Sequence, residues 1–138
     1  MALATAASAC GGSNNNPTAA QPTVTVTATP QPELFEGTLA VGGAAFFSFT
    51  VQATGDADVM MASVTTSPAP GTSTGVALGM AIGSPLGTDC NVIKAVLAAA
   101  ALQSPLVSNL TPGIYCVRVY DVGTLSAPVN FAVRIVHT

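Results

Sequence analysis

Cysteines are the first residues of this chain whose type and spacing could do chemistry. Cys90 and Cys116 lie among strand-like patterns, and an exported domain of this size commonly closes a loop with such a pair. Two free thiols or half of a metal site are the alternatives, but no second histidine or nearby cysteine completes a zinc set. We therefore expect a Cys90–Cys116 disulfide, which stabilises by on the order of 3 kcal/mol in the chain-entropy model.

Carboxylates form the second candidate group. Asp56 and Asp58 stand two residues apart, a spacing that suits calcium when backbone carbonyls and a third carboxylate such as Asp121 or Asp89 join them. The competing interpretation is that Asp favours the turn before the next strand. We expect the turn, and no cofactor, with calcium kept as an alternative.

Catalytic residues are not apparent. The one histidine, His137, precedes the final residue, where we expect a side chain to be held too loosely for a general base. Glu33 and Glu36 could form an acid/base pair, but a solvated strand edge is the usual role of such residues. The sequence has no Gly-x-Ser-x-Gly, no phosphate-binding glycine loop and no His-Glu-x-x-His. We expect a protein that is not an enzyme.

Composition restricts the partners. Charged residues make up 7% of the 138, with a net charge of −3, and Lys and Arg do not cluster as phosphate binding requires. The longest nearly apolar run, 92–102, contains Lys94 and is shorter than the ~20 residues of a membrane-spanning helix. Tyr115, Tyr120 and Phe46 could present an aromatic surface to a carbohydrate, but core packing is their more common use. We expect no nucleic-acid partner, and membrane contact only through a lipid.

The elements that must position these residues are strands. Alternation over 34–41 and 44–52, joined by Gly42 and Gly43, predicts an antiparallel hairpin. A second hairpin is predicted from the last two strands, 114–121 and 129–135. Further strands are expected at 58–66, 75–82 and 104–110, while Ala and Leu leave a short helix open within 91–103.

Two strands have informative faces. In 114–121, Tyr115, Val117 and Val119 share one face, which indicates a buried central strand. In 75–82, one face carries only small residues such as Gly79 and Ala81, which suits the close approach of another layer. Short strands at turn spacings of about eight to twelve residues predict an all-β antiparallel sandwich of about seven to eight strands.

The first 32 residues differ from the rest. Residues 1–10 are small and apolar up to Cys10, and they resemble the end of a bacterial lipoprotein signal peptide, which implies lipidation of Cys10. An Ala-rich tail with an incidental cysteine is the alternative. Residues 11–32 read as a disordered or extended linker. Within them 23–29 alternates strictly, so it is either a tether or a strand that adds to a neighbouring molecule's sheet. The β-sandwich domain is expected over 33–138.

Three motifs are similar to those of a known family. Phe-Glu-Gly-Thr-Leu at 35–39, Ala-Phe-Phe-Ser-Phe-Thr-Val at 45–51, and Leu-Thr-Pro-Gly-Ile-Tyr-Cys-Val-Arg-Val-Tyr-Asp at 110–121 resemble the bacterial pre-peptidase C-terminal domain. The resemblance covers about 33–137 and implies a small sandwich of jelly-roll type. Members of that family are usually accessory parts of secreted proteases and other surface proteins.

These features together predict a non-catalytic, exported and lipid-anchored cell-surface module for binding or adhesion. Its location is expected to be extracytoplasmic, on the outer surface or the periplasmic face, or secreted. Its partner would be a protein or polysaccharide, and a homo-oligomer is an alternative. The loops 67–74, 83–90 and 122–127 are the expected binding sites. The alternative is a structural subunit of an extracellular fibre or coat, joined through 23–29.

Overall fold

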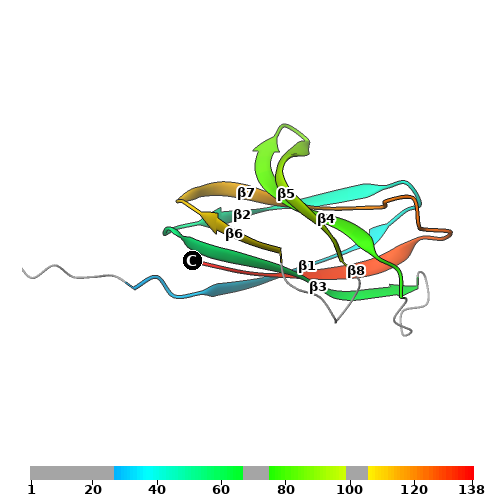
Figure 1. The fold of residues 1–138 in the computed structure, drawn as a ribbon, viewed down its shortest axis with the longest axis horizontal. Helices are drawn as coiled ribbons and strands as arrows, with labels where there is room; N and C mark the ends of the chain where they lie inside the picture. The colour runs from blue at the N-terminus through cyan, green and yellow to red at the C-terminus, as the bar shows by residue number, and fades with distance from the viewer. Residues whose placement is uncertain (1–26, 67–74, 99–105) are drawn as a thin grey trace, which may run out of the picture.

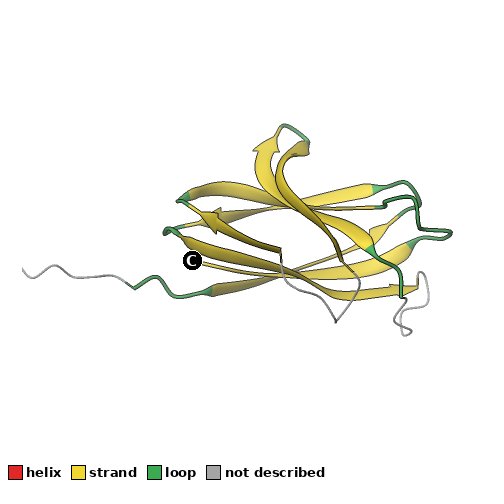
Figure 2. Cartoon of the chain, in the orientation of Figure 1, coloured by secondary structure: helices red, strands yellow, loops and turns green. Residues whose placement is uncertain are grey.

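The computed structural model describes residues 27–66, 75–98 and 106–138. They form eight β-strands and no helix (Figures 1 and 2). Among the residues described, no helix has the length and apolar character needed to cross a membrane. The strands are β1 (Gln31–Leu39), β2 (Ala44–Val51), β3 (Gly55–Thr66), β4 (Leu78–Leu86), β5 (Asp89–Ala98), β6 (Leu106–Leu110), β7 (Gly113–Tyr120) and β8 (Val129–His137).

The strands form two antiparallel sheets of four, packed face to face. Sheet A has the order β1-β8-β3-β6, and sheet B has the order β2-β7-β4-β5, which is the upper layer in Figure 1. Two four-stranded sheets with these crossovers form a jelly roll. The predicted antiparallel β-sandwich of jelly-roll type is therefore confirmed.

The core lies between the sheets and is filled by alternate residues of each strand. In β7, Val117 and Val119 are fully buried and Tyr115 packs against the same cluster, as the alternation predicted. Met61 of β3 and Ile135 of β8 face them from sheet A. The side chains that alternate with these point outward, so each sheet has an outer face of its own.

Both predicted hairpins are wrong. β1 pairs with β8, and β2 pairs with β7, so the turn at 40–43 carries the chain from one sheet to the other. β7 and β8 likewise lie in different sheets. The alternating pattern reports which side of a strand is buried, but it carries no information on which strand lies beside it.

The helix left open within 91–103 is not formed over the described residues, because β5 runs as a strand to Ala98. Residues 99–103 lie outside the described ranges, as does the predicted loop 67–74. β5 is an edge strand and most of its side chains are exposed, so it lacks the clean alternation that identifies a half-buried strand.

The β4–β5 hairpin bends at Gly83. Ile82 pairs with Lys94 but Gly83 pairs with Val92, so β5 carries one extra residue there, which is a β-bulge. A methyl group on Gly83 would collide with the backbone of Asn91. Because no side chain stands between them, β5 can fold closely over β4, and the end of the hairpin rises above sheet B (Figure 1).

The Cys90–Cys116 disulfide holds this raised end, which confirms the predicted pairing. Cys90 is on β5 and Cys116 is on β7, with β4 between them in the sheet. Strands two positions apart in a flat sheet are separated by about 9.6 Å, whereas these two Cα atoms are 5.9 Å apart. The hairpin end therefore folds back over the outer face of sheet B and buries Cys116 completely.

Candidate functional site

A hollow on the outer face of sheet A brings together short polar side chains from three adjacent strands. Ala132 of β8 pairs with Glu36 of β1 on one side and with Ser63 of β3 on the other. Along β8 it stands between the longer side chains of Asn130 and Arg134, so the floor of the hollow is low there. The lining residues are Glu36, Gly37, Thr38, Ser63, Thr65, Asn130, Phe131 and Ala132.

Hydrogen bonding orients the polar groups of this hollow. Asn130 pairs with Thr38 and Thr65 across the strands, and the Thr38 hydroxyl donates to Asn130 Oδ1 at 2.8 Å. Glu36 is exposed and brings the one carboxylate among the lining residues. The hollow therefore offers hydroxyl, amide and carboxylate groups along a row of strands, a set that suits ligands rich in hydroxyl groups.

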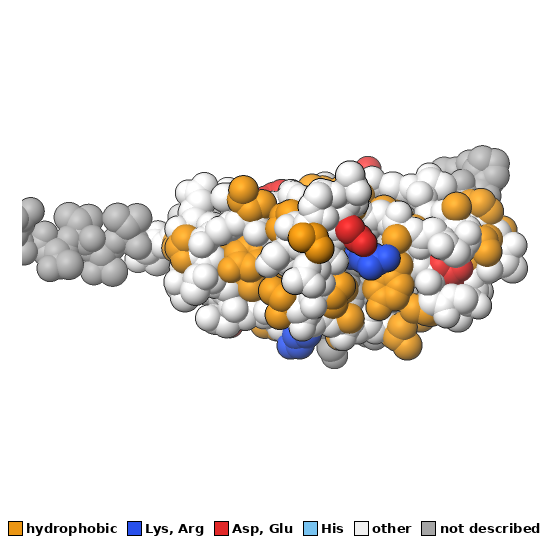
Figure 3. All heavy atoms as spheres, turned by 90° about the horizontal axis from the view of Figure 1, so that it is seen from above, with side chains coloured by type: hydrophobic (Ala, Val, Ile, Leu, Met, Phe, Trp, Pro, Cys, Tyr) orange, Lys and Arg blue, Asp and Glu red, His pale blue; other side chains and the backbone are white. Residues whose placement is uncertain are grey.

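The outer face of sheet B has the opposite character. Figure 3 looks down on this face and shows hydrophobic side chains spread around one acidic and one basic group that touch. Arg118 Nη1 of β7 lies 3.7 Å from Asp89 Oδ1, and its guanidinium lies 5.4 Å from the centre of the Tyr120 ring. Gly79 leaves the space that this ring occupies, in agreement with the predicted small face of β4.

Asp121, the proposed third calcium ligand, caps the loop that follows β7. Its Oδ2 accepts a hydrogen bond from the amide of Gly42, and its Oδ1 accepts from the amides of Gly123, Thr124 and Leu125. The Gly42 amide contributes most to lowering the pKa of Asp121; burial acts in the opposite direction, and the other three amides add to the lowering. This carboxylate therefore ties the loop 122–127 to the turn between β1 and β2.

The calcium candidates do not meet. Asp56 Oδ1 accepts a hydrogen bond from Asn109 Nδ2 at 2.9 Å, and Asp58 is exposed two residues further along β3. Asp121 instead lies against the turn between β1 and β2. No group of three potential metal ligands occurs within the described residues.

His137 is held firmly, which the sequence reasoning did not expect. Its ring is buried, lies 5.1 Å from that of Phe49, and its Nε2 is 2.7 Å from Glu33 Oε1. The last residues of β8 pair with the first of β1, so a position near the chain end is not a loose one here. Glu33 and Glu36 lie on opposite faces of β1, which removes the proposed acid/base pair.

The aromatic candidates also separate. Tyr115 faces the core beside Phe49, whereas Tyr120 lies over Gly79 on the outer face of sheet B. Tyr115, Tyr120 and Phe46 therefore do not form one aromatic platform. Cys10 lies outside the described residues, and so does most of 23–29, of which Thr27, Ala28 and Thr29 are described and lie in no strand.

Sequence reasoning missed the hollow on sheet A. Its available signal was local: where the three strands meet at the hollow, their outward positions carry polar side chains and one alanine. Each strand alone looks like an ordinary solvent-facing one, and only the order β1-β8-β3 brings the three together.

Comparison with known proteins gives no match to any family model and none to a curated protein.

Proposed function

We propose that this protein is a non-catalytic, exported and lipid-anchored cell-surface module that binds a partner through the outer face of sheet A. The observation that carries the proposal is the hollow described above, in which three strands present hydroxyl, amide and carboxylate groups together. The jelly-roll strand order supports it as well, because pre-peptidase C-terminal domains have folds of this type.

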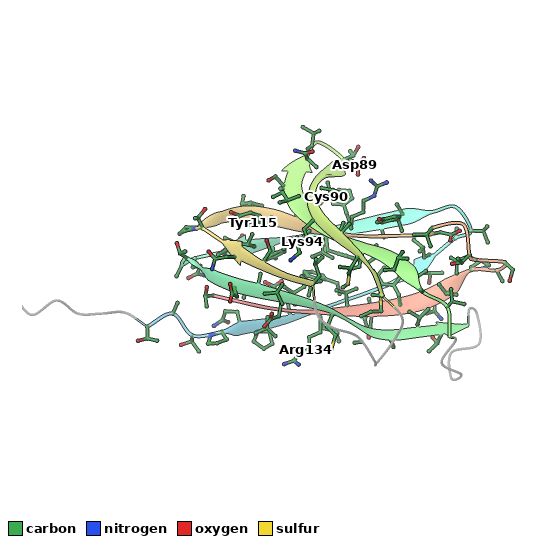
Figure 4. All side chains as sticks on the ribbon, in the orientation of Figure 1. Asp89, Cys90, Lys94, Tyr115 and Arg134 are labelled. Carbon is green, nitrogen blue, oxygen red and sulfur yellow. A yellow bond between two sulfur atoms is a disulfide. The ribbon has the colours of Figure 1, made fainter. Side chains whose placement is uncertain are left out.

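A neutral polysaccharide is the partner that suits this surface best. Its hydroxyl groups both donate and accept, which matches Thr38, Asn130 and the Glu36 carboxylate. An anionic polymer would need clustered basic groups, whereas the lining of the hollow has no Lys or Arg, and Arg134, a basic residue of the same face, points away from the sandwich in Figure 4.

The proposed export rests on the disulfide, and the proposed anchoring rests on Cys10. The Cys90–Cys116 bridge is compatible with an oxidising, extracytoplasmic location, where disulfides persist. Lipidation of Cys10 would fix the chain to a membrane, and residues 11–32 would serve as the spacer that lets the sandwich reach its partner.

Binding can be tested by electrophoresis through gels that contain soluble neutral polysaccharides. Thr38→Val and Thr65→Val keep the β-branched shape but remove a hydroxyl group from the hollow, so each should weaken retardation at least about fivefold. Thr50→Val is the matched control, since Thr50 is exposed on the other sheet. Equal binding by all three variants would reject the sheet A surface.

The anchor can be tested by intact mass of the native protein. A diacylglycerol-sized increment that disappears with Cys10→Ala is the expected result. An unmodified Cys10 in the membrane fraction of the producing cell would reject the lipid anchor, and it would leave the proposed binding surface untouched.

A second candidate is a structural subunit of an extracellular fibre or coat, in which segment 23–29 adds as a strand to a neighbour. The observation that favours it is β5, a ten-residue edge strand that exposes Ile93 and Leu97. Deleting 11–29, which ends before β1 begins at Gln31, and measuring the mass by light scattering tests this candidate: an assembly that survives the deletion unchanged excludes it.

A further inference from the structure

We propose that the outer face of sheet B is the interface through which two copies of this chain form a two-fold dimer. Most of the large hydrophobic side chains that the described residues expose belong to three neighbouring strands of this sheet, β4, β5 and β7. They are Leu86, Val92, Ile93, Leu97 and Ile114, with exposed fractions between 42% and 68%. Several exposed large hydrophobic side chains on neighbouring strands of one sheet mark an interaction site.

The outer face of sheet A is the contrasting surface of the same molecule. It carries Leu34 as an exposed large hydrophobic side chain, together with the charged residues Glu36, Asp58 and Arg134. Covering sheet A would remove water from these charges. Covering sheet B removes it from five large hydrophobic side chains and from Asp89 and Arg118, two opposite charges that lie together. Association through sheet B is therefore the less costly of the two.

The charges on sheet B indicate that the occupant is a second copy. Asp89 and Arg118 lie side by side within the apolar face, and their side chains are 62% and 33% exposed. Asp89 Oδ1 accepts a hydrogen bond from the Cys90 amide, but its 3.7 Å separation from Arg118 Nη1 is too long for one, so both side chains can still pair across an interface. In a two-fold arrangement the Asp89 of each copy faces the Arg118 of the other, so the surface complements itself.

The raised end of the hairpin suits the same arrangement. Figure 4 shows Asp89 and Cys90 at this end, above the level of sheet B. It carries Leu86 and Val92, while Ile114 lies on β7 at the lower level of the sheet. A two-fold axis beside the hairpin would set each raised end against the lower part of the other copy, and the disulfide keeps that end in place.

Sedimentation equilibrium of the full chain tests the dimer, with Cys10→Ala so that no disulfide through that residue contributes. The wild-type surface should give twice the chain mass at micromolar concentration. Leu97→Glu and Ile114→Glu should each raise the dissociation constant at least about tenfold. Leu34→Glu is the control, because it is equally exposed but lies on sheet A, and it should leave the dimer intact.

A charge-exchange experiment tests the two-fold geometry itself. Asp89→Arg alone leaves two arginines on each copy's interface, and Arg118→Asp alone leaves two aspartates on each, so like charges face one another and each variant should be monomeric. Mixed in equal amounts, the two should form a heterodimer, provided that circular dichroism shows both to be folded. Failure of two folded variants to associate on mixing would overturn the proposed pairing.

Three outcomes would overturn the dimer. One is a monomer at all concentrations up to about 100 μM, and another is equal dissociation by Leu97→Glu and Leu34→Glu. The third is a monomer that floats with neutral phosphatidylcholine vesicles and loses this property with Leu97→Glu, since the apolar face would then contact lipid instead. Removal of 11–29 should leave the dimer intact, which separates the dimer from strand addition. The Thr38→Val binding test does not depend on the dimer.

Discussion

Reduction of the Cys90–Cys116 disulfide should destabilise the domain in two distinguishable ways. The bridge joins two residues that are 26 positions apart in the sequence, so it closes a loop of this length in the unfolded chain. In the chain-entropy model a loop of this length corresponds to about 12 cal/mol/K, or roughly 3.5 kcal/mol at room temperature. For a domain of about 100 residues, this predicts a fall of roughly 14–28 °C in the melting temperature.

The second effect is local and comes from the native state. The bridge joins β5 to β7 across β4, and the raised end also meets β7 through the loose Asp89–Arg118 pair. Without the bridge the raised end should open more often than the rest of the sheet. Amide exchange of residues 84–93 should therefore accelerate in the folded, reduced protein, well before global unfolding.

The assay is urea unfolding and native-state hydrogen exchange on the Cys10→Ala chain, oxidised and reduced. A stability loss below about 1 kcal/mol would refute the loop-closure reasoning. If the amides of residues 84–93 stay equally protected against hydrogen exchange, the predicted local opening is refuted, because the hairpin end would then be held by its own packing. Cys90→Ala with Cys116→Ala should reproduce the reduced protein and serves as the control for the reductant.

Two tightly packed glycines, a capped carboxylate and a buried histidine can each be tested by substitution. Gly83→Ala should lower the free energy of unfolding by about 3 kcal/mol, because the added methyl group meets the backbone of Asn91. Gly79→Ala should lower it by about 1 kcal/mol, because the methyl group meets the Tyr120 ring, which can turn away. Equal losses of stability in urea unfolding would contradict this prediction. Asp121→Asn should destabilise the domain above about pH 4, and this loss should disappear as the pH falls further. The reason is that the pKa of Asp121 is lowered on folding, so the stability that its charged form contributes is lost as the pH falls through the folded-state pKa. A difference in melting temperature that does not change with pH would contradict this prediction. His137→Ala should lower the free energy of unfolding by about 3 kcal/mol, because it leaves a cavity. Glu33→Gln, at a partly exposed site, should lower it by less than about 1 kcal/mol. The reverse order in thermal melts would show that the contact between Glu33 and His137 matters more than the packing of the ring.

The sequence predicted the inward and outward faces of the strands well. Alternation placed Val117 and Val119 on the inner face of β7, and Cys116 and Arg118 on its outer face, because one face of each strand packs against the other sheet in a sandwich. Cys116 is nevertheless buried, since the end of the β4–β5 hairpin covers it. Spacing and composition were also enough to pair Cys90 with Cys116. These features depend on local periodicity or on a small set of cysteines.

Strand neighbours could not be predicted in the same way. The turn at 40–43 contains the glycines of a hairpin, yet a short turn serves equally well to cross between sheets. The hollow around Ala132 and the apolar face around Leu97 both depend on which strands are adjacent, so neither was visible in advance. His137 was misjudged for the same reason, since its burial comes from the pairing of β8 with β1.

The central place of β8 in sheet A has a consequence for the way the protein folds during synthesis. β8 lies between β1 and β3, and in the strand order β1 has no other neighbour. Leu39 and the other inward residues of β1 therefore cannot complete their packing until residues 129–137 have been made. Pairings this distant along the chain make folding slow and late.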